Sequence, residues 1–146
     1  WKKYGVTPGP FLKALKSGKN VKYKGKVLKA KDFTYLKRGK SLVYLTDLVY
    51  EKKLVKFAKD ADVLIIEATF SSALQEKAKE AFHLTIADAL TLAKEASVKA
   101  VYLVHTSQRY ESSSVSLKNE IAGLKDKLRL KAEVFLPDDL SKIEFC

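Results

Sequence analysis

Several residue types that mark common protein classes are scarce in this sequence. Its one cysteine, Cys146, excludes an intrachain disulfide and a zinc site built on thiolates, so a reducing compartment, the cytoplasm, is expected. No apolar run approaches the roughly 18 residues of a membrane span, and the run Val63–Ile66 stops at Glu67. No apolar signal-peptide core follows the first lysines. Because methionine is absent and the chain starts at Trp1, we expect the C-terminal part of a longer protein.

The positive charge of the chain is concentrated at one end. Residues 1–40 hold 13 Lys and Arg against a single acid, Asp32, whereas residues 41–146 hold 15 against 16 acids. Such asymmetry favours an anionic partner, nucleic acid first. A solubilising surface in a lysine-rich protein is the alternative, because a charged patch by itself identifies no ligand.

Apolar patterns alternate between strand and helix spacing along most of the chain. Strands are expected at residues 41–45, 62–66, 101–104 and 132–136, the last of these as a core strand, with a further edge at 142–145. Helices are expected at 50–59, 74–81, 85–96 and 117–130, and a polar loop at 107–116. A short helix that Pro10 can open and Gly18 can end, and a hairpin at 21–30, precede them. The alternation predicts an α/β fold in which helices are layered on a sheet.

Carboxylates and imidazoles follow three of the expected strands. Asp47, Glu67 and His105 come after successive strands, and His83 stands just before the capping box that starts at Thr85. Sites in α/β sheets form beyond the carboxyl ends of the strands, so these side chains should lie close together. Carboxylate and imidazole suit a metal such as zinc, but the set is too small for a complete catalytic centre.

Five segments of the chain form an ordered series of motifs. They are Gly5-Val6-Thr7-Pro8-Gly9-Pro10, Val43-Tyr44-Leu45-Thr46-Asp47, Glu67-Ala68-Thr69-Phe70, Phe82-His83-Leu84-Thr85 and Leu103-Val104-His105-Thr106-Ser107-Gln108-Arg109-Tyr110. Together they resemble the C-terminal half of ribonuclease Z, a family of tRNA 3′-processing endonucleases in the metallo-β-lactamase superfamily. The similarity spans most of the chain, and its strength lies in the order and spacing of the motifs.

The resemblance implies a fold and a function. Residues 1–146 would be the C-terminal half of the αββα metallo-β-lactamase sandwich, and the N-terminal half with its His-x-His-x-Asp-His segment is absent from this sequence. The complete protein would be a zinc-dependent endoribonuclease that removes 3′ trailers from precursor tRNA, with two zinc ions in its site and a second copy in a homodimer. The chain alone would be inactive without its missing half.

The resemblance also implies roles for individual residues. Asp47 would bridge the two zinc ions, and His105 would be a terminal ligand of one of them. Glu67 and His83 would form a hydrogen-bonded pair in which His83 protonates the leaving 3′ oxygen. The residues that would bind substrate are Pro8, Gly9, Pro10, Lys13, Lys16 and Arg109.

Four positions depart from the family pattern. Thr46 replaces a glycine, Leu48 a threonine, Ile66 a histidine and Thr106 an aromatic residue. None of them removes a proposed ligand or acid. Two other functions stay open at this point: another hydrolase or phosphodiesterase of the same fold, and a non-catalytic basic module that binds RNA.

Overall fold

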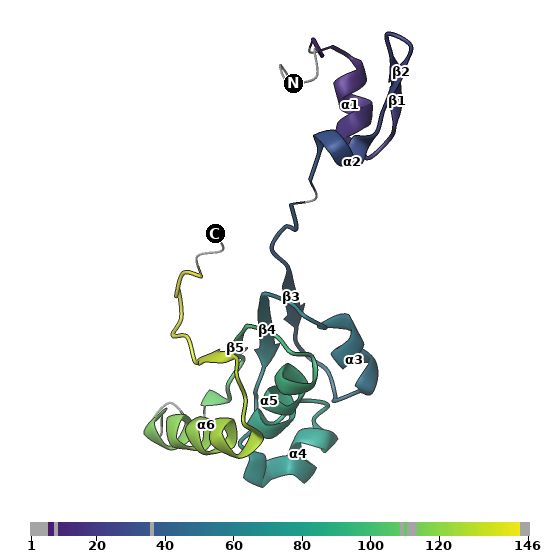
Figure 1. The fold of residues 1–146 in the computed structure, drawn as a ribbon. Helices are drawn as coiled ribbons and strands as arrows, with labels where there is room; N and C mark the ends of the chain where they lie inside the picture. The colour runs from purple at the N-terminus through teal and green to yellow at the C-terminus, as the bar shows by residue number, and fades with distance from the viewer. Residues whose placement is uncertain (1–5, 8, 36, 109, 111–113, 144–146) are drawn as a thin grey trace. The chain divides into compact units, whose positions relative to one another are not determined.

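A computed structural model describes residues 6–7, 9–35, 37–108, 110 and 114–143 (Figure 1). The chain divides into two compact units, Trp1–Gly39 and Lys40–Cys146, and each is considered by itself. In the described part of the chain, no helix combines the length and the apolar character that crossing a membrane requires.

The first unit is a hairpin between two short helices. Its elements are α1 (Phe11–Lys16), β1 (Val21–Tyr23), β2 (Lys26–Leu28) and α2 (Ala30–Phe33). The strands are antiparallel, and the turn between them places Lys24 and Gly25 at φ 46° and 78°, the left-handed geometry of a two-residue hairpin turn. The expected helix and hairpin are confirmed. Helix α2 was not expected, because four residues are too few to show a helical period.

The second unit is a parallel sheet with its connecting helices. Its elements are β3 (Leu42–Leu45), α3 (Lys52–Phe57), β4 (Val63–Glu67), the 3-10 helix η2 (Ser72–Leu74), α4 (Gln75–Glu80), α5 (Ile86–Glu95), β5 (Ala100–Val104), α6 (Ser114–Leu128) and β6 (Glu133–Phe135). The four strands pair in the order β3-β4-β5-β6, all parallel. The α/β prediction is confirmed, and the predicted capping box at Thr85 is formed.

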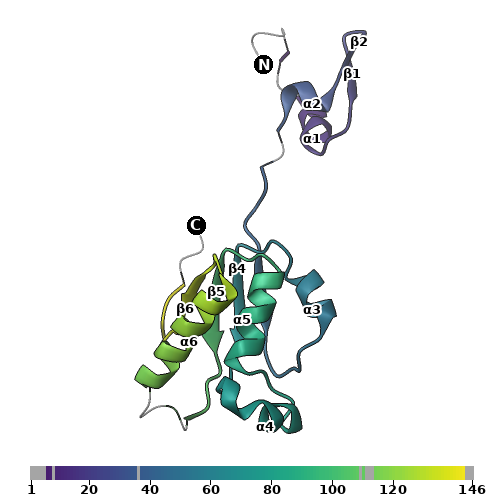
Figure 2. The same ribbon diagram turned by 60° about the horizontal axis from the view of Figure 1, so that its bottom comes forward.

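One face of the sheet packs against helices and forms the core. Figure 2 shows α5 and α6 lying along this face. The strand residues that share it, among them Leu64, Ile66, Val101 and Leu103, belong to one buried cluster with the apolar face of α5. Because successive strand residues point to opposite faces, the remaining residues define a second face.

The second face carries a row of apolar side chains across all four strands. Tyr44, Ile65, Tyr102 and Phe135 are register partners from β3 to β6. The rings of Tyr102 and Phe135 stack with their centroids 4.6 Å apart. Tyr44 is 62% exposed and Phe135 38% exposed, so this apolar row is open to solvent in the chain as it stands.

The sequence expectations fail at three places near the C-terminus. The expected polar loop at 107–116 ends early, because α6 begins at Ser114, in a polar turn that shows no apolar period. Strand β6 lies at the sheet edge with Glu133 and Phe135 exposed, so it is not the core strand we expected. Residues 142 and 143 form no strand, and the rest of the expected edge at 142–145 lies outside the described residues.

Candidate functional site

The candidate site forms at the carboxyl ends of the sheet strands, as the sequence predicts. Glu67 is the last residue of β4, while Asp47 and His105 follow β3 and β5. Asp47 and His105 adopt left-handed backbone conformations with φ of 52° and 57°, which turn the chain at the strand ends. Asp and His enter this region more readily than most side chains.

His83 is brought to the site by the end of α4. The helix closes with two backbone bonds, from Phe82 N–H to the Lys79 carbonyl at 3.1 Å and from His83 N–H to the Ala78 carbonyl at 2.9 Å. Phe82 has φ 59°, at a position of the helix end that glycine usually fills. This closure directs the chain toward β4 immediately before the capping box of α5.

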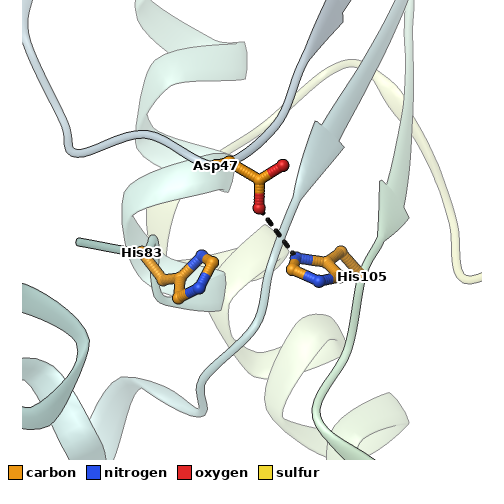
Figure 3. Close-up of side chains that lie close together, drawn as sticks. All are labelled: Asp47, His83 and His105. Atoms are coloured by element: carbon orange, nitrogen blue, oxygen red, sulfur yellow. Dashed lines mark ion pairs between the residues drawn. The ribbon is translucent and has the colours of Figure 1, made fainter. Parts of the chain in front are cut away.

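Asp47, His83 and His105 form a cluster that could hold a metal ion. One ligand atom from each lies within 4.8 Å of the others (Figure 3). Asp47 Oδ1 is 3.8 Å from His105 Nδ1, and the two imidazole rings are 5.3 Å apart between centroids. One carboxylate and two imidazoles fit the ligand preferences of zinc and related ions. Three ligand atoms fill only part of the coordination shell of one ion, so a two-metal site needs further ligands.

Glu67 is fully buried and accepts four hydrogen bonds. Its Oε1 accepts from the Leu48 backbone N–H at 2.8 Å. Its Oε2 accepts from the Thr69 hydroxyl at 2.6 Å and the Leu84 backbone N–H at 3.3 Å, and it lies 2.8 Å from His83 Nδ1. The structure thus brings the predicted Glu67–His83 pair into direct contact.

Thr69 is a residue at the site that sequence reasoning missed. It lies two residues after Glu67, and its hydroxyl is 2.6 Å from Glu67 Oε2 and 3.2 Å from His105 Nδ1. The signal was the threonine in Glu67-Ala68-Thr69-Phe70, but nothing in the sequence shows that this segment touches a residue 36 positions later.

The structure shows the surroundings of the four residues that depart from the expected motifs. Ile66 is fully buried in the core cluster, on the opposite face of β4 from Glu67. Leu48 serves the site through its backbone N–H, which any non-proline residue supplies. Thr106 lines a cavity of about 930 Å³ beside His105, and Thr46 lines a smaller one beside Asp47.

Four of the six predicted substrate-binding residues are described by the structure, and all four lie in the first unit of the chain. Gly9, Pro10, Lys13 and Lys16 belong to the first unit, where Pro10 opens α1 and both lysines are exposed. Pro8 and Arg109 lie outside the described residues. The structure therefore places the four acid and imidazole residues of the predicted set together, and no substrate-binding role is assigned by it.

Comparisons with known proteins point in one direction. The profile of the β-lactamase superfamily domain matches residues 31–106. Ribonuclease Z of Nanoarchaeum equitans is 32% identical over 143 residues, covering 98% of this chain and 43% of that protein. Ribonuclease Z of Methanococcus maripaludis is 37% identical over 142 residues, covering 95% of this chain and 46% of that protein.

A solved structure agrees with these relatives. The crystal structure of human tRNase Z, short form, matches with a TM-score of 0.54 and 31% sequence identity, over 82% of this chain and 37% of that one. The chain thus spans less than half the length of the relatives that it matches.

Proposed function

This chain belongs to the β-lactamase superfamily, and we propose that it is the C-terminal part of a zinc-dependent endoribonuclease that removes 3′ trailers from precursor tRNA. The observation that carries the proposal is the Glu67–His83 pair, 2.8 Å apart, beside a second imidazole and a carboxylate at the strand ends. Relatives named ribonuclease Z support the choice of substrate. We propose that the protein acts on this substrate in the cytoplasm.

Asp47 and His105 are the residues that we propose as metal ligands. Their donor atoms suit zinc, and both side chains are accessible at the end of the sheet. Two bound zinc ions would supply charge neutralisation at a phosphodiester and a hydroxide near neutral pH. The ligands that these two residues do not provide would come from the missing N-terminal half, so we expect the chain alone to cleave nothing.

His83 is the residue that we propose as proton donor. Its Nδ1 faces the buried Glu67 carboxylate, which holds the ring in one orientation. The other nitrogen, Nε2, is then the atom that can give a proton to the leaving 3′ oxygen. Glu67 acts through the imidazole, because its own oxygens are taken up by four donors inside the fold.

The exposed apolar face of the sheet supports the proposal that residues 1–146 form an incomplete domain. The apolar row of Tyr44, Ile65, Tyr102 and Phe135 leaves large side chains in water, and a sheet normally buries such a face against a second layer. We propose that the second layer is the N-terminal half, so that residues 1–146 form one half of the αββα sandwich. The completed protein would act as a homodimer.

The proposed function is tested by comparing two variants in the protein completed by its N-terminal half. His83→Ala should reduce the cleavage rate of precursor tRNA by about 10²- to 10⁴-fold, the usual contribution of a general acid, and should leave zinc content and tRNA affinity near the parent values. Asp47→Ala should lose zinc together with activity. Tyr50→Phe, which removes a hydroxyl bonded to Glu95, is the control and should cleave at the parent rate.

The outcomes separate the alternatives. If His83→Ala strips zinc as Asp47→Ala does, His83 is a metal ligand and not the proton donor. If both variants cleave at the parent rate, the roles assigned to Asp47 and His83 are wrong. If the completed protein binds tRNA but cleaves no precursor, the basic RNA-binding module is the better interpretation. Hydrolysis of bis(p-nitrophenyl) phosphate without cleavage of precursor tRNA would favour a different phosphodiesterase.

The first 40 residues should carry most of the RNA affinity, because the excess of positive charge lies there. Phosphate contacts release counterions, so tRNA binding should weaken steeply as salt rises. The test compares two triple charge reversals to glutamate in a filter-binding assay. One changes Lys13, Lys16 and Lys19, and the matched control changes Lys125, Lys127 and Lys131. We expect a much larger loss of tRNA affinity in the variant changed within the first 40 residues than in the control. Equal losses in the two variants would contradict the prediction.

A further inference from the structure

Thr69 lies between the proposed proton-donor pair and the second histidine of the cluster. Its hydroxyl oxygen is 2.6 Å from Glu67 Oε2 and 3.2 Å from His105 Nδ1. We infer that Thr69 is a positioning residue, which fixes His105 as the Nδ1–H tautomer and joins it to the Glu67–His83 pair. The tautomer follows from the contacts alone, and only its meaning for a metal rests on the proposed function.

The first step concerns the direction of the bond between Thr69 and Glu67. The backbone N–H groups of Leu48 and Leu84 reach one carboxylate oxygen each, and an amide N–H can only donate. Both oxygens of Glu67 are therefore acceptors. A separation of 2.6 Å is typical of a hydroxyl that donates to a carboxylate. The Thr69 hydroxyl thus gives its proton to Glu67.

The second step concerns the bond between Thr69 and His105. A hydroxyl has one proton, and that proton already points to Glu67. Toward His105 the oxygen can only accept, so the hydrogen bond requires a proton on Nδ1. Asp47 Oδ1, 3.8 Å from the same nitrogen, is also an acceptor and favours the same assignment.

The two histidines then share one arrangement. His83 Nδ1 faces Glu67 Oε2 directly, and His105 Nδ1 reaches the same oxygen through the Thr69 hydroxyl. Each ring keeps its Nε2 free of these bonds. In a complete site, His105 Nε2 would offer its lone pair to a metal. The reason is that the hydrogen bond made by one ring nitrogen determines which nitrogen is left to bind the metal.

The placement of Thr69 is fixed by the backbone around it. Ala68 N–H donates to the Val104 carbonyl at 2.9 Å, and Ser107 N–H donates to the Thr69 carbonyl at 3.1 Å. The end of β4 is thereby tied to the segment on both sides of His105. Thr69 is also buried and branched at Cβ, which restricts its rotamer. The hydroxyl is therefore held in position before any metal binds.

The inference is tested by NMR on the metal-free chain labelled with ¹⁵N-histidine. The chain has two histidines, so long-range ¹H–¹⁵N correlations give two ring patterns without overlap from others. At a pH where the rings are neutral, both should show the Nδ1–H tautomer. An Nε2–H tautomer for His105 in the parent chain overturns the inference, and this measurement depends on no variant.

Two variants then test the role of the hydroxyl. Thr69→Val keeps the shape and removes the oxygen, so His105 should lose its single tautomer while His83 keeps its pattern. Thr69→Ser keeps the hydroxyl and should match the parent. An unchanged His105 in Thr69→Val would refute the positioning role. If Thr69→Val unfolds, which would alter the His83 pattern as well, the parent and Thr69→Ser spectra decide.

Zinc affinity in the completed protein gives an independent readout. Loss of a partner that orients a metal-ligating histidine typically costs 10- to 100-fold in metal affinity, so Thr69→Val should weaken zinc by about that factor and Thr69→Ser should restore it. Parent-like affinity in Thr69→Val would overturn the link to the metal. A protein that shows both Nδ1–H tautomers but leaves precursor tRNA intact would refute the proposed function and leave this inference standing.

Discussion

Replacing Glu67 by glutamine tests how the buried carboxylate holds the site together. The change keeps the size of the side chain and exchanges one acceptor oxygen for an NH₂ group. Leu48 N–H can keep its acceptor if the amide oxygen takes the place of Oε1. The NH₂ group then takes the place of Oε2, where Thr69, His83 and the Leu84 backbone all meet it.

The three groups at Oε2 respond differently. The Thr69 hydroxyl and the His83 ring can change from donor to acceptor, and the two hydrogens of the amide then satisfy them. Leu84 N–H cannot change, so a buried backbone donor is left facing another donor. An unsatisfied buried donor costs about 1–3 kcal/mol, and we expect the free energy of unfolding to fall by about that amount.

Urea unfolding of Glu67→Gln and of Glu133→Gln measures this effect. Glu133 is the matched control, because it also lies in a strand of the same sheet but is exposed, and its replacement should change the free energy of unfolding by less than about 0.5 kcal/mol. Equal stabilities of the two variants would show that Glu67 is not the acceptor that its contacts imply. Glu67→Gln should also convert both histidines to the Nε2–H tautomer, since Thr69 would then donate to His105.

Two further predictions concern stability away from the site. Burial, followed by the hydrogen bond to Glu95, raises the pKa of the Tyr50 hydroxyl to about 12. The protonated Tyr50 hydroxyl therefore contributes to stability fully below about pH 10, the pKa of tyrosine in the unfolded chain, and this contribution is lost as the pH rises toward 12. The free energy of unfolding, measured across this range, should fall more steeply with pH for the parent than for Tyr50→Phe. Ser97 follows α5 with φ 55°. Ser97→Gly should raise the free energy of unfolding by about 0.5–1 kcal/mol, because it relieves a left-handed strain of about 1–2 kcal/mol at some cost in chain entropy, and Ser97→Ala should show no such gain.

The sequence predicts the sheet and the strand-end residues because both depend on local patterns. Apolar runs define β3, β4 and β5 within about one residue, and a parallel sheet brings the residues after those strands to one edge. The contact between Glu67 and His83 could be anticipated, since the sequence predicts only one short helix between them. The edge position of β6 could not, because Val134 and its neighbours show the same apolar pattern whether or not another strand lies beyond them.

The role of Thr69 was beyond sequence reasoning for a related reason. A threonine after a buried strand has many ordinary uses, and the direction of its hydroxyl depends on which donors reach Glu67 from other segments. Leu48 and Leu84 determine that direction through their backbone N–H groups, which every residue except proline has, so the residue types do not reveal it. Even a complete list of the site's side chains would therefore have left the histidine tautomers open.

The burial of the site residues indicates what this chain supplies by itself. Glu67 is fully buried and Thr69 is 8% exposed, whereas the side chains of His83, His105 and Asp47 are 23%, 50% and 73% exposed. The groups that orient others are thus fixed inside the fold, and the groups proposed to meet a metal or a phosphate lie progressively toward solvent. A complete metal site would have to cover those exposed groups with ligands from elsewhere. We therefore propose that the chain supplies a prearranged proton-donor pair and a partial metal shell, and that a second layer on the open face of the sheet completes both the core and the site.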